Sequence, residues 1–513
     1  MDQSSLIMPK ITIFSSQYQE EKINLYQINM NIMKFKLGIL AIVLGSFGVL
    51  NAQSKTMPFT LKIKANGFSN SYCFLANHFG KQKYKVDSIR LDKSGQALYV
   101  DKDKKVKGGI YILVFPTAGN QYAELIISGA EKNMEIQLDS SDFRSVKVLN
   151  SKENEIFYSD VKYLEPFSSE MSRLSTEYKS CPNDECKKPL EVKIRAKEKE
   201  LVDRRISVIN NSPTLLYSKI LKLMRDVEVP EPPKDANGKI DSTFKYWYFK
   251  NHYWDHTDFN DDRLLFTPIF EDKFKYYFDQ LIIKHPDTIK KECDFILRKI
   301  NNPNSDMMRY CLASLLNDYA NSKIMGQDAL YVYLVDNYYA KGKAPWTDSA
   351  DIKKMKGDAD DLRDLLIGNY GKNFTVFDTT LVNYKSLYDM NTEYKVVVFW
   401  SQDCGHCKKE IPVLDSIYPS LLKEGCDVFA VCTVTESGDN VNIWKKFIRD
   451  NKLRFKNYAD PKFAMTPSFR ILYSIKGTPE YYILDRQNKI IAKKLAPEQM
   501  VDFLKNYKKT LKK

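Results

Sequence analysis

The most constraining feature of this sequence is the stretch "VVVFWSQDCGHCKKEIPVL", from Val396 to Leu414. A short run of β-branched and aromatic residues predicts a buried strand, and the charged run after it predicts a helix beginning at Cys404. Cys404 and Cys407 therefore lie at a strand-to-helix junction, with two residues between them. This spacing is compatible with a redox pair, with half of a zinc site, or with chance composition.

The chain around this junction alternates between predicted strands and helices. Strands are predicted for "CDVFAVCTV", "EYYILD" and "IIAKKL", and helices for "NVNIWKKFIRDN" and for the segment from Pro497. Such alternation is typical of a central sheet with helices on both faces. We therefore predict a C-terminal α/β domain over residues 365–513.

The rest of the chain has a different organisation. With 513 residues the chain is too long for one hydrophobic core, so several domains are expected. Period-two runs such as "GIYILVF" predict a small antiparallel β domain over residues 53–148. From Asn150 the apolar period becomes helical, which predicts a mostly α-helical domain over residues 149–364.

The formal charge of +13 is spread over many lysines. This distribution is typical of a solvated surface, and no nucleic-acid partner is predicted.

The segment "MKFKLGILAIVLGSFGVLNAQ", from Met33 to Gln53, bears on the compartment. Its short basic start, its apolar run of about 14 residues and its small residues before a cleavage point are typical of a secretory signal peptide. We predict a signal peptide at residues 33–52, a misassigned extension at residues 1–32, and a location in the periplasm or cell envelope. Disulfides persist in such compartments, so Cys181 and Cys186 are candidates for a small disulfide.

The C-terminal domain contains the motifs Phe399-Trp400, Cys404-Gly405-His406-Cys407, Lys408-Lys409-Glu410 with Pro412, and Thr478-Pro479 ahead of "YYILD". Through these motifs it resembles the thioredoxin fold, and more narrowly the exported thiol-disulfide oxidoreductases of the TlpA and ResA kind. The resemblance covers residues 365–513. The helical region resembles an uncharacterised domain often found upstream of such modules, through "YWDHTDFNDDRLLFTP" and "SKIMGQDALYVYL".

The resemblance implies roles for individual residues. Cys404 would attack, Cys407 would resolve the mixed disulfide, and Pro479 would be a cis-proline facing them. Glu410 would handle protons at the dithiol, because Val398 stands where thioredoxin has a buried aspartate. The residues expected to support the active site are Trp400, Gly405, His406, Thr478 and Pro479.

Elementary electrostatics gives a partly independent prediction for Cys404. Unpaired N–H groups and the helix dipole at a helix N-terminus favour a thiolate. His406 adds a positive charge when it is protonated. Asp403 opposes both effects, and it departs from the apolar or aromatic residue common there in thioredoxins. We expect a net lowering of the Cys404 pKa.

A metal site is the alternative use of these side chains. The nearest further thiols, Cys426 and Cys432, lie in or beside a predicted buried strand without CxxC spacing. His252 and His256 have the i, i+4 spacing of helix-borne ligands, but no third ligand is evident by spacing. We predict no metal and no cofactor.

These observations predict an exported thiol-disulfide oxidoreductase that acts as a reductant or isomerase on protein cysteines. Its expected partners are substrate proteins with cysteines or disulfides and a membrane or envelope electron-transfer partner. One alternative is a thiol peroxidase, although "WSQDC" lacks the usual Pro-x-x-x-Thr-x-x-Cys context. The other is a non-catalytic envelope binding protein in which the C-terminal domain only docks.

Overall fold

The computed structural model describes residues 58–116, 121–234 and 238–511. The predicted extension at residues 1–32 and the predicted signal peptide at residues 33–52 lie outside the described residues. The chain divides into two compact units, one mainly up to Pro233 and the other mainly Lys273–Lys513. Each unit is described by itself.

The first unit begins with a β-sandwich of two four-stranded sheets, ordered β4-β1-β7-β8 and β3-β2-β5-β6. Alternate residues of each strand point inward, so that Ile63 and Ile136 from one sheet meet Leu75 and Leu113 from the other in a single core. The strands are β1 (Thr60–Asn66), β2 (Tyr72–Phe79), β3 (Gln82–Arg90), β4 (Gln96–Val100), β5 (Gly109–Phe115), β6 (Gln121–Ile127), β7 (Asn133–Asp139) and β8 (Asp142–Leu149).

The predicted β domain is confirmed, with one difference in strand direction. β1 pairs with β7 in parallel, while every other pair among these eight strands is antiparallel. Period-two patterning specifies which face of a strand is buried but not which strand becomes its neighbour. The parallel pair therefore could not be predicted from the sequence.

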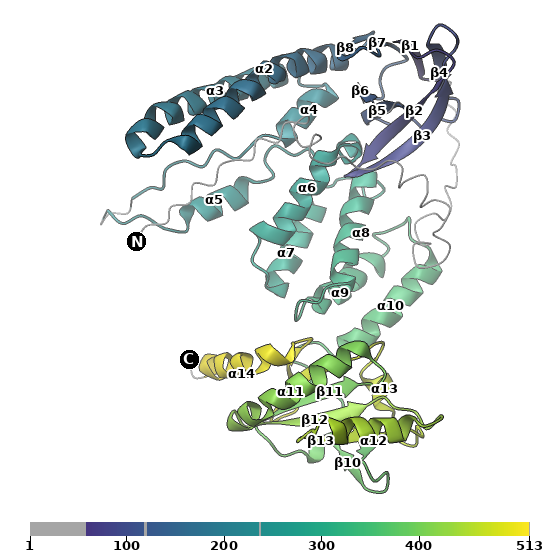
Figure 1. The fold of residues 1–513 in the computed structure, drawn as a ribbon, viewed down its shortest axis with the longest axis vertical. Helices are drawn as coiled ribbons and strands as arrows, with labels where there is room; N and C mark the ends of the chain where they lie inside the picture. Colours follow the sequence, from purple (N-terminus) through teal and green to yellow (C-terminus); the bar gives the residue numbers. More distant parts are fainter. Residues whose placement is uncertain (1–57, 117–120, 235–237, 512–513) are drawn as a thin grey trace. The chain divides into compact units, whose positions relative to one another are not determined.

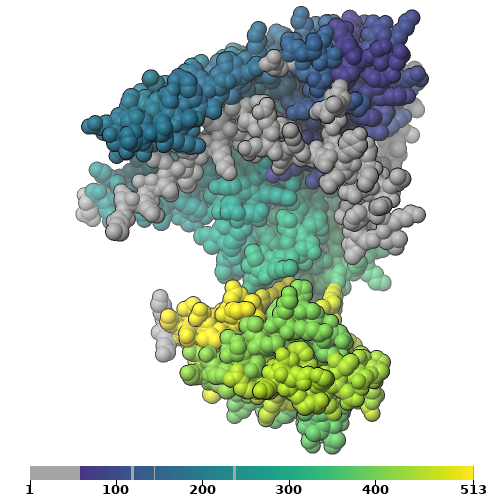
Figure 2. Space-filling view, viewed as in Figure 1, coloured from purple at the N-terminus to yellow at the C-terminus, as the bar shows by residue number. Residues whose placement is uncertain are grey.

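Three helices follow the sandwich: α2 (Lys152–Ser180), α3 (Asp184–Asn211) and α4 (Leu216–Leu223). α2 and α3 run side by side as a long hairpin, visible as a ribbon in Figure 1 and as a continuous blue surface in Figure 2. The buried Glu153 carboxylate accepts hydrogen bonds from the N–H groups of Leu216 and Tyr217 at 2.8 and 2.9 Å. α4 has no side-chain cap of its own, so a carboxylate from α2 satisfies its first turn.

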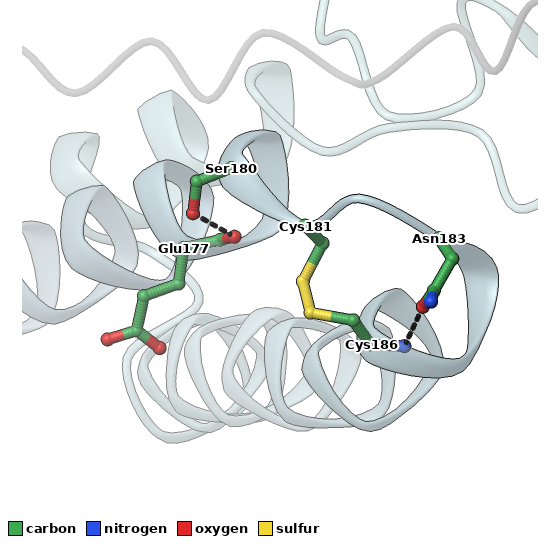
Figure 3. Close-up of a disulfide and its surroundings, with 5 residues drawn as sticks. All are labelled: Glu177, Ser180, Cys181, Asn183 and Cys186. Carbon is green, nitrogen blue, oxygen red and sulfur yellow. Dashed lines mark hydrogen bonds between the residues drawn. A yellow bond between two sulfur atoms is a disulfide. The ribbon is translucent and has the colours of Figure 1, made fainter.

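A disulfide between Cys181 and Cys186 closes the turn of this hairpin (Figure 3). Cys181 is the C-cap of α2, and Cys186 lies in the first turn of α3. The Asn183 side chain caps α3 by accepting a hydrogen bond from the Cys186 N–H at 3.0 Å. The sequence suggested this disulfide, and the structure contains it.

The helical region continues up to the C-terminal sheet, and its predicted helical character is confirmed. Its elements are α5 (Phe244–His252), the 3₁₀ helix η1 (Asp262–Phe266), α6 (Pro268–Tyr276), the π-helical η2 (Tyr277–Leu281), α7 (Pro286–Leu297), α8 (Asp306–Ala320), α9 (Asp328–Leu334), the π-helical η3 (Val335–Tyr339) and α10 (Ser349–Arg363).

The C-terminal domain is a seven-stranded sheet in the order β10-β9-β13-β12-β11-β14-β15, as the α/β prediction required. β11, β12 and β13 are parallel, and β14 and β15 continue the sheet antiparallel. The elements are β9 (Thr375–Phe377), β10 (Tyr384–Ser386), η4 (Leu387–Asp389), β11 (Tyr394–Trp400), α11 (Gly405–Lys423), β12 (Cys426–Cys432), α12 (Asn440–Asp450), β13 (Lys456–Ala459), α13 (Phe469–Leu472), β14 (Glu480–Asp485), β15 (Ile490–Lys493) and α14 (Pro497–Leu511).

Polar contacts join this sheet to helices α9 and α10 within the same unit. Lys493 on β15 forms a buried ion pair with Asp328 of α9. The Lys476 ammonium lies 2.7 Å from the Asp358 carboxylate, and the Ser474 hydroxyl donates to Asp361 at 3.0 Å. α10 thereby holds the loop that leads into Pro479.

Within the described ranges, none of the helices combines the length and the apolar character needed to cross a membrane.

Candidate active site

Cys404 lies where β11 ends and α11 begins, and it is the N-cap residue of α11. Its Sγ accepts a hydrogen bond from the Cys407 N–H at 3.5 Å and donates to the carbonyl oxygen of Thr478 at 3.0 Å. The thiol is partly exposed. A nucleophile in this position is reachable from solvent and touches the loop that carries Pro479.

The two thiols of the pair have opposite environments. Partial burial acts to raise the pKa of Cys404, but hydrogen bonds from the Cys407 N–H and its thiol, and from Thr478 and His406, outweigh it and lower the pKa below its ordinary value. Cys407 is fully buried, and burial raises its pKa to about 12. The expected lowering of the Cys404 pKa therefore agrees in direction with the structure.

The peptide bond between Thr478 and Pro479 is cis, the geometry that the resemblance implied. It lies directly before β14, the antiparallel neighbour of β11. A second cis bond joins Thr466 and Pro467, which sequence reasoning did not anticipate.

The other supporting residues differ in what they do. Trp400 is fully buried at the end of β11, and its ring packs against Phe447 with centroids 5.2 Å apart. His406 is exposed on the first turn of α11. Gly405 is open to solvent, and a Cβ there would meet nothing within 4 Å, so sterics do not require glycine. Packing therefore does not fix the position of Gly405 or His406, the two residues between the thiols.

The Asp403 carboxylate is hydrogen-bonded to the side chain of the neighbouring Gln402. It accepts a hydrogen bond from the amide of the buried Gln402 at 2.9 Å, and the Gln402 oxygen in turn receives one from the Cys432 thiol at 3.3 Å. This chain of contacts gives the acidic residue beside the nucleophile a partner other than Cys404.

Glu410 lies on α11 one turn after Cys407 and is half-buried. Val398 is buried on β11, and its antiparallel partner on β14 is Tyr481. Tyr481 faces both Glu410 and Cys407, and sequence reasoning missed it. The available signal was its place two residues after Pro479, on a strand predicted to lie beside the active-site strand.

The candidate metal ligands do not come together. In the ranges that the structure describes, no group of three or more His, Cys, Asp or Glu side chains is arranged to hold a metal ion. Cys426 and Cys432 are buried on β12, and His252 Nδ1 lies 2.6 Å from an Asp255 carboxylate oxygen.

Residues 367–493 match the AhpC/TSA family. The C-terminal domain belongs to this family. Residues 196–363, upstream of this AhpC/TSA domain, match a domain of unknown function, DUF5106. The resemblance drawn from the motifs is thereby confirmed, both for the thioredoxin-like module and for the uncharacterised domain before it.

Individual relatives of the AhpC/TSA domain carry the name of an activity. The thiol-disulfide oxidoreductase ResA of Bacillus cereus is 24% identical over 147 residues, which span 29% of this chain and 79% of ResA. The sporulation thiol-disulfide oxidoreductase A of Bacillus subtilis is 26% identical over 102 residues, 20% of this chain and 59% of that protein. The chain is therefore an enzyme of the thiol-disulfide oxidoreductase class.

Two solved structures are also similar. A domain of a possible thiol-disulfide isomerase from Cytophaga hutchinsonii is 36% identical, covering 29% of this chain and 96% of that one, with a TM-score of 0.26. A thioredoxin-like protein from Bacteroides caccae is 19% identical, covering 54% of this chain and 98% of that one, with a TM-score of 0.33.

Proposed function

We propose that this protein is an exported thiol-disulfide oxidoreductase that acts on protein cysteines through Cys404 and Cys407, as a reductant or isomerase of the cell envelope. The observation that carries the proposal is the contrast between the two thiols. Cys404 is accessible, caps a helix and has a lowered pKa, whereas Cys407 is fully buried with a pKa of about 12. Cys404 is therefore suited to attack a substrate disulfide, and Cys407 is suited to resolve the mixed disulfide that forms.

In the first step the Cys404 thiolate attacks one sulfur of a substrate disulfide. A Cys404–substrate disulfide forms, the substrate S–S bond breaks, and the second substrate cysteine leaves as a thiolate. The Thr478 carbonyl, 3.0 Å from Cys404, lies beside the place where the substrate sulfur must arrive. We assign to the backbone before Pro479 the role of pairing with the substrate chain, which the Thr478–Cys404 contact supports.

In the second step Cys407 loses its proton and attacks the Cys404 sulfur. The Cys404–Cys407 disulfide forms, and the remaining substrate cysteine leaves reduced. A thiol with a pKa of about 12 is ionised to only about one part in 10⁵ at pH 7, so this step needs a proton acceptor. Glu410, one turn further along α11, is the acceptor that we assign.

The oxidised dithiol must then be reduced by a partner, which we place in the membrane or envelope. The segment from Met33 to Gln53 supports export, because its basic start, apolar run and small residues are typical of a signal peptide. No cofactor is needed, since two thiols and one disulfide balance the electrons of each turnover.

Reduction of insulin by dithiothreitol, followed beside consumption of hydrogen peroxide, tests the proposal. We expect the full chain to accelerate insulin reduction and to leave peroxide largely untouched. Fast peroxide consumption would support the thiol peroxidase instead. Activity in neither assay would favour the non-catalytic binding protein.

A further inference from the structure

Tyr481 lies two residues after Pro479, on the face of β14 that packs against α11. The register of the sheet places it directly beside Val398, the position that lacks an acid. Tyr481, Val398 and Cys407 belong to one buried cluster, and Tyr481 is only 4% exposed. A phenol side chain therefore extends beneath the dithiol.

The hydroxyl of Tyr481 is enclosed by protein, and its polar neighbour is the Glu410 carboxylate, to which it can donate, although no hydrogen bond of standard geometry to a described residue is formed. The groups that face it are Glu410 and Cys407 on α11 and Glu498 in the first turn of α14. A buried hydroxyl is costly to leave unpaired, so Tyr481 must pair with a protein group, and the Glu410 carboxylate is the acceptor beside it.

We propose that the Tyr481 hydroxyl relays the proton of Cys407 to Glu410 during release of the mixed disulfide. This inference rests on the proposed function and adds Tyr481 to the residues that carry it out. A hydroxyl can accept one hydrogen bond while it donates another, which a relay requires.

The proton transfer balances without any further reactant. The Cys407 thiol gives its proton to the Tyr481 oxygen while the phenol proton moves to a Glu410 carboxylate oxygen. The products are a Cys407 thiolate, a protonated Glu410 and an unchanged Tyr481. Burial, reinforced by Glu410 and Cys407, raises the pKa of Tyr481, so the phenol stays neutral between transfers.

The relay can be isolated with an aromatic disulfide that releases a coloured thiolate. Stopped-flow reaction of the reduced full chain gives two phases, because Cys404 releases the first coloured thiolate and Cys407 releases the second. The other unpaired cysteines are buried. The leaving group is a stable thiolate, so the second phase reports the loss of the Cys407 proton.

Tyr481→Phe keeps the ring and removes only the hydroxyl. We expect the second phase to slow roughly tenfold near pH 7, with the first phase unchanged, and the deficit to shrink as the pH rises and solvent takes the proton instead. Tyr482→Phe is the matched control, because Tyr482 is the next residue on β14 and packs on the opposite face against Phe399 and Tyr473. Equal second phases in wild type and Tyr481→Phe, or equal slowing by Tyr482→Phe, would overturn the relay.

Glu410→Gln separates this inference from the function on which it rests. We expect Glu410→Gln to slow the second phase, and the double variant with Tyr481→Phe to be no slower than Glu410→Gln alone, because both act in one path. Independent, multiplying effects would remove Tyr481 from the path to Glu410 and leave the dithiol function standing. A wild-type protein with no second phase would contradict the proposed function itself.

Discussion

The chain contains two closely spaced cysteine pairs that begin from a similar local geometry. In each pair the second cysteine lies in the first turn of a helix and its N–H donates to an N-cap side chain. At α11 that side chain is the Cys404 thiol, whereas at α3 it is the amide oxygen of Asn183. The two pairs thus differ in the N-cap residue. At α11 the N-cap is itself a cysteine, which puts a thiol at the helix N-terminus, whereas at α3 it is an asparagine and the two cysteines form a disulfide.

The position of the first cysteine completes the contrast. Cys404 lies at the positive end of the α11 dipole, which favours its thiolate form. Cys181 is the C-cap of α2 and meets the negative end of a dipole, which disfavours one. The surroundings differ as well, because Cys407 is buried against a sheet while Cys186 is exposed at a hairpin turn (Figure 3). Close spacing alone therefore does not make a cysteine pair reactive.

The largest expected effect comes from removing the nucleophile. Cys404→Ser should reduce insulin reduction to the rate of dithiothreitol alone, because no accessible helix-capping thiol remains. The double variant Cys181→Ser/Cys186→Ser should retain most of the activity. Comparable losses in the two variants would show that the pairs do not differ in function as proposed.

Removing the buried thiol should stop the reaction halfway. Cys407→Ser leaves Cys404 able to attack but unable to be released, so mixed disulfides with substrate proteins accumulate. Non-reducing gels of envelope extracts should show adducts that disappear with reductant. The same adducts from Cys404→Ser would reverse the roles of the two thiols.

Alkylation of the reduced protein should distinguish the thiols by pH. The lowered pKa of Cys404 keeps its thiolate populated below the ordinary thiol range, whereas Cys407, with a pKa of about 12, stays protonated. Iodoacetamide near pH 7 should label Cys404 severalfold faster than Cys407, as followed by peptide mass spectrometry. Labelling of Cys407 first would contradict the assigned asymmetry.

The disulfide should contribute stability to the hairpin. Cys181 and Cys186 are separated by five positions, and closing so short a loop is worth about 2 kcal/mol in the chain-entropy account. Cys181→Ser/Cys186→Ser should lower hydrogen-exchange protection at the adjoining ends of α2 and α3 and leave β11 and α11 unchanged. Equal loss of protection in both regions would mean that the disulfide acts on the whole fold.

The smallest effect should come from the α3 cap. Asn183→Ala removes the acceptor of the Cys186 N–H and should cost about 1 kcal/mol of local stability. Thermal unfolding with the disulfide intact measures it, and Asn183→Asp is the control that keeps an acceptor. Equal destabilisation by both substitutions would show that the cap oxygen is not the important feature.

Much of the C-terminal domain was predictable because its signals are local. The strand before Cys404, the helix after it and the strand Glu480–Asp485 all follow from apolar runs and spacing. β13 was missed because its four residues, Lys456–Ala459, form no apolar run, and α13 was missed because four residues are too few to establish a helical period.

The sequence by itself determined the strand–CGHC–helix junction, the order of domain types and the positions of the thiols. Only the tertiary structure decided that Thr478 contacts Cys404 across 74 positions and that Tyr481 faces Glu410 and Cys407. The physical reason is the range of the forces involved. Helix and strand signals act between residues a few positions apart, whereas burial and cross-strand pairing depend on the register in which distant segments meet.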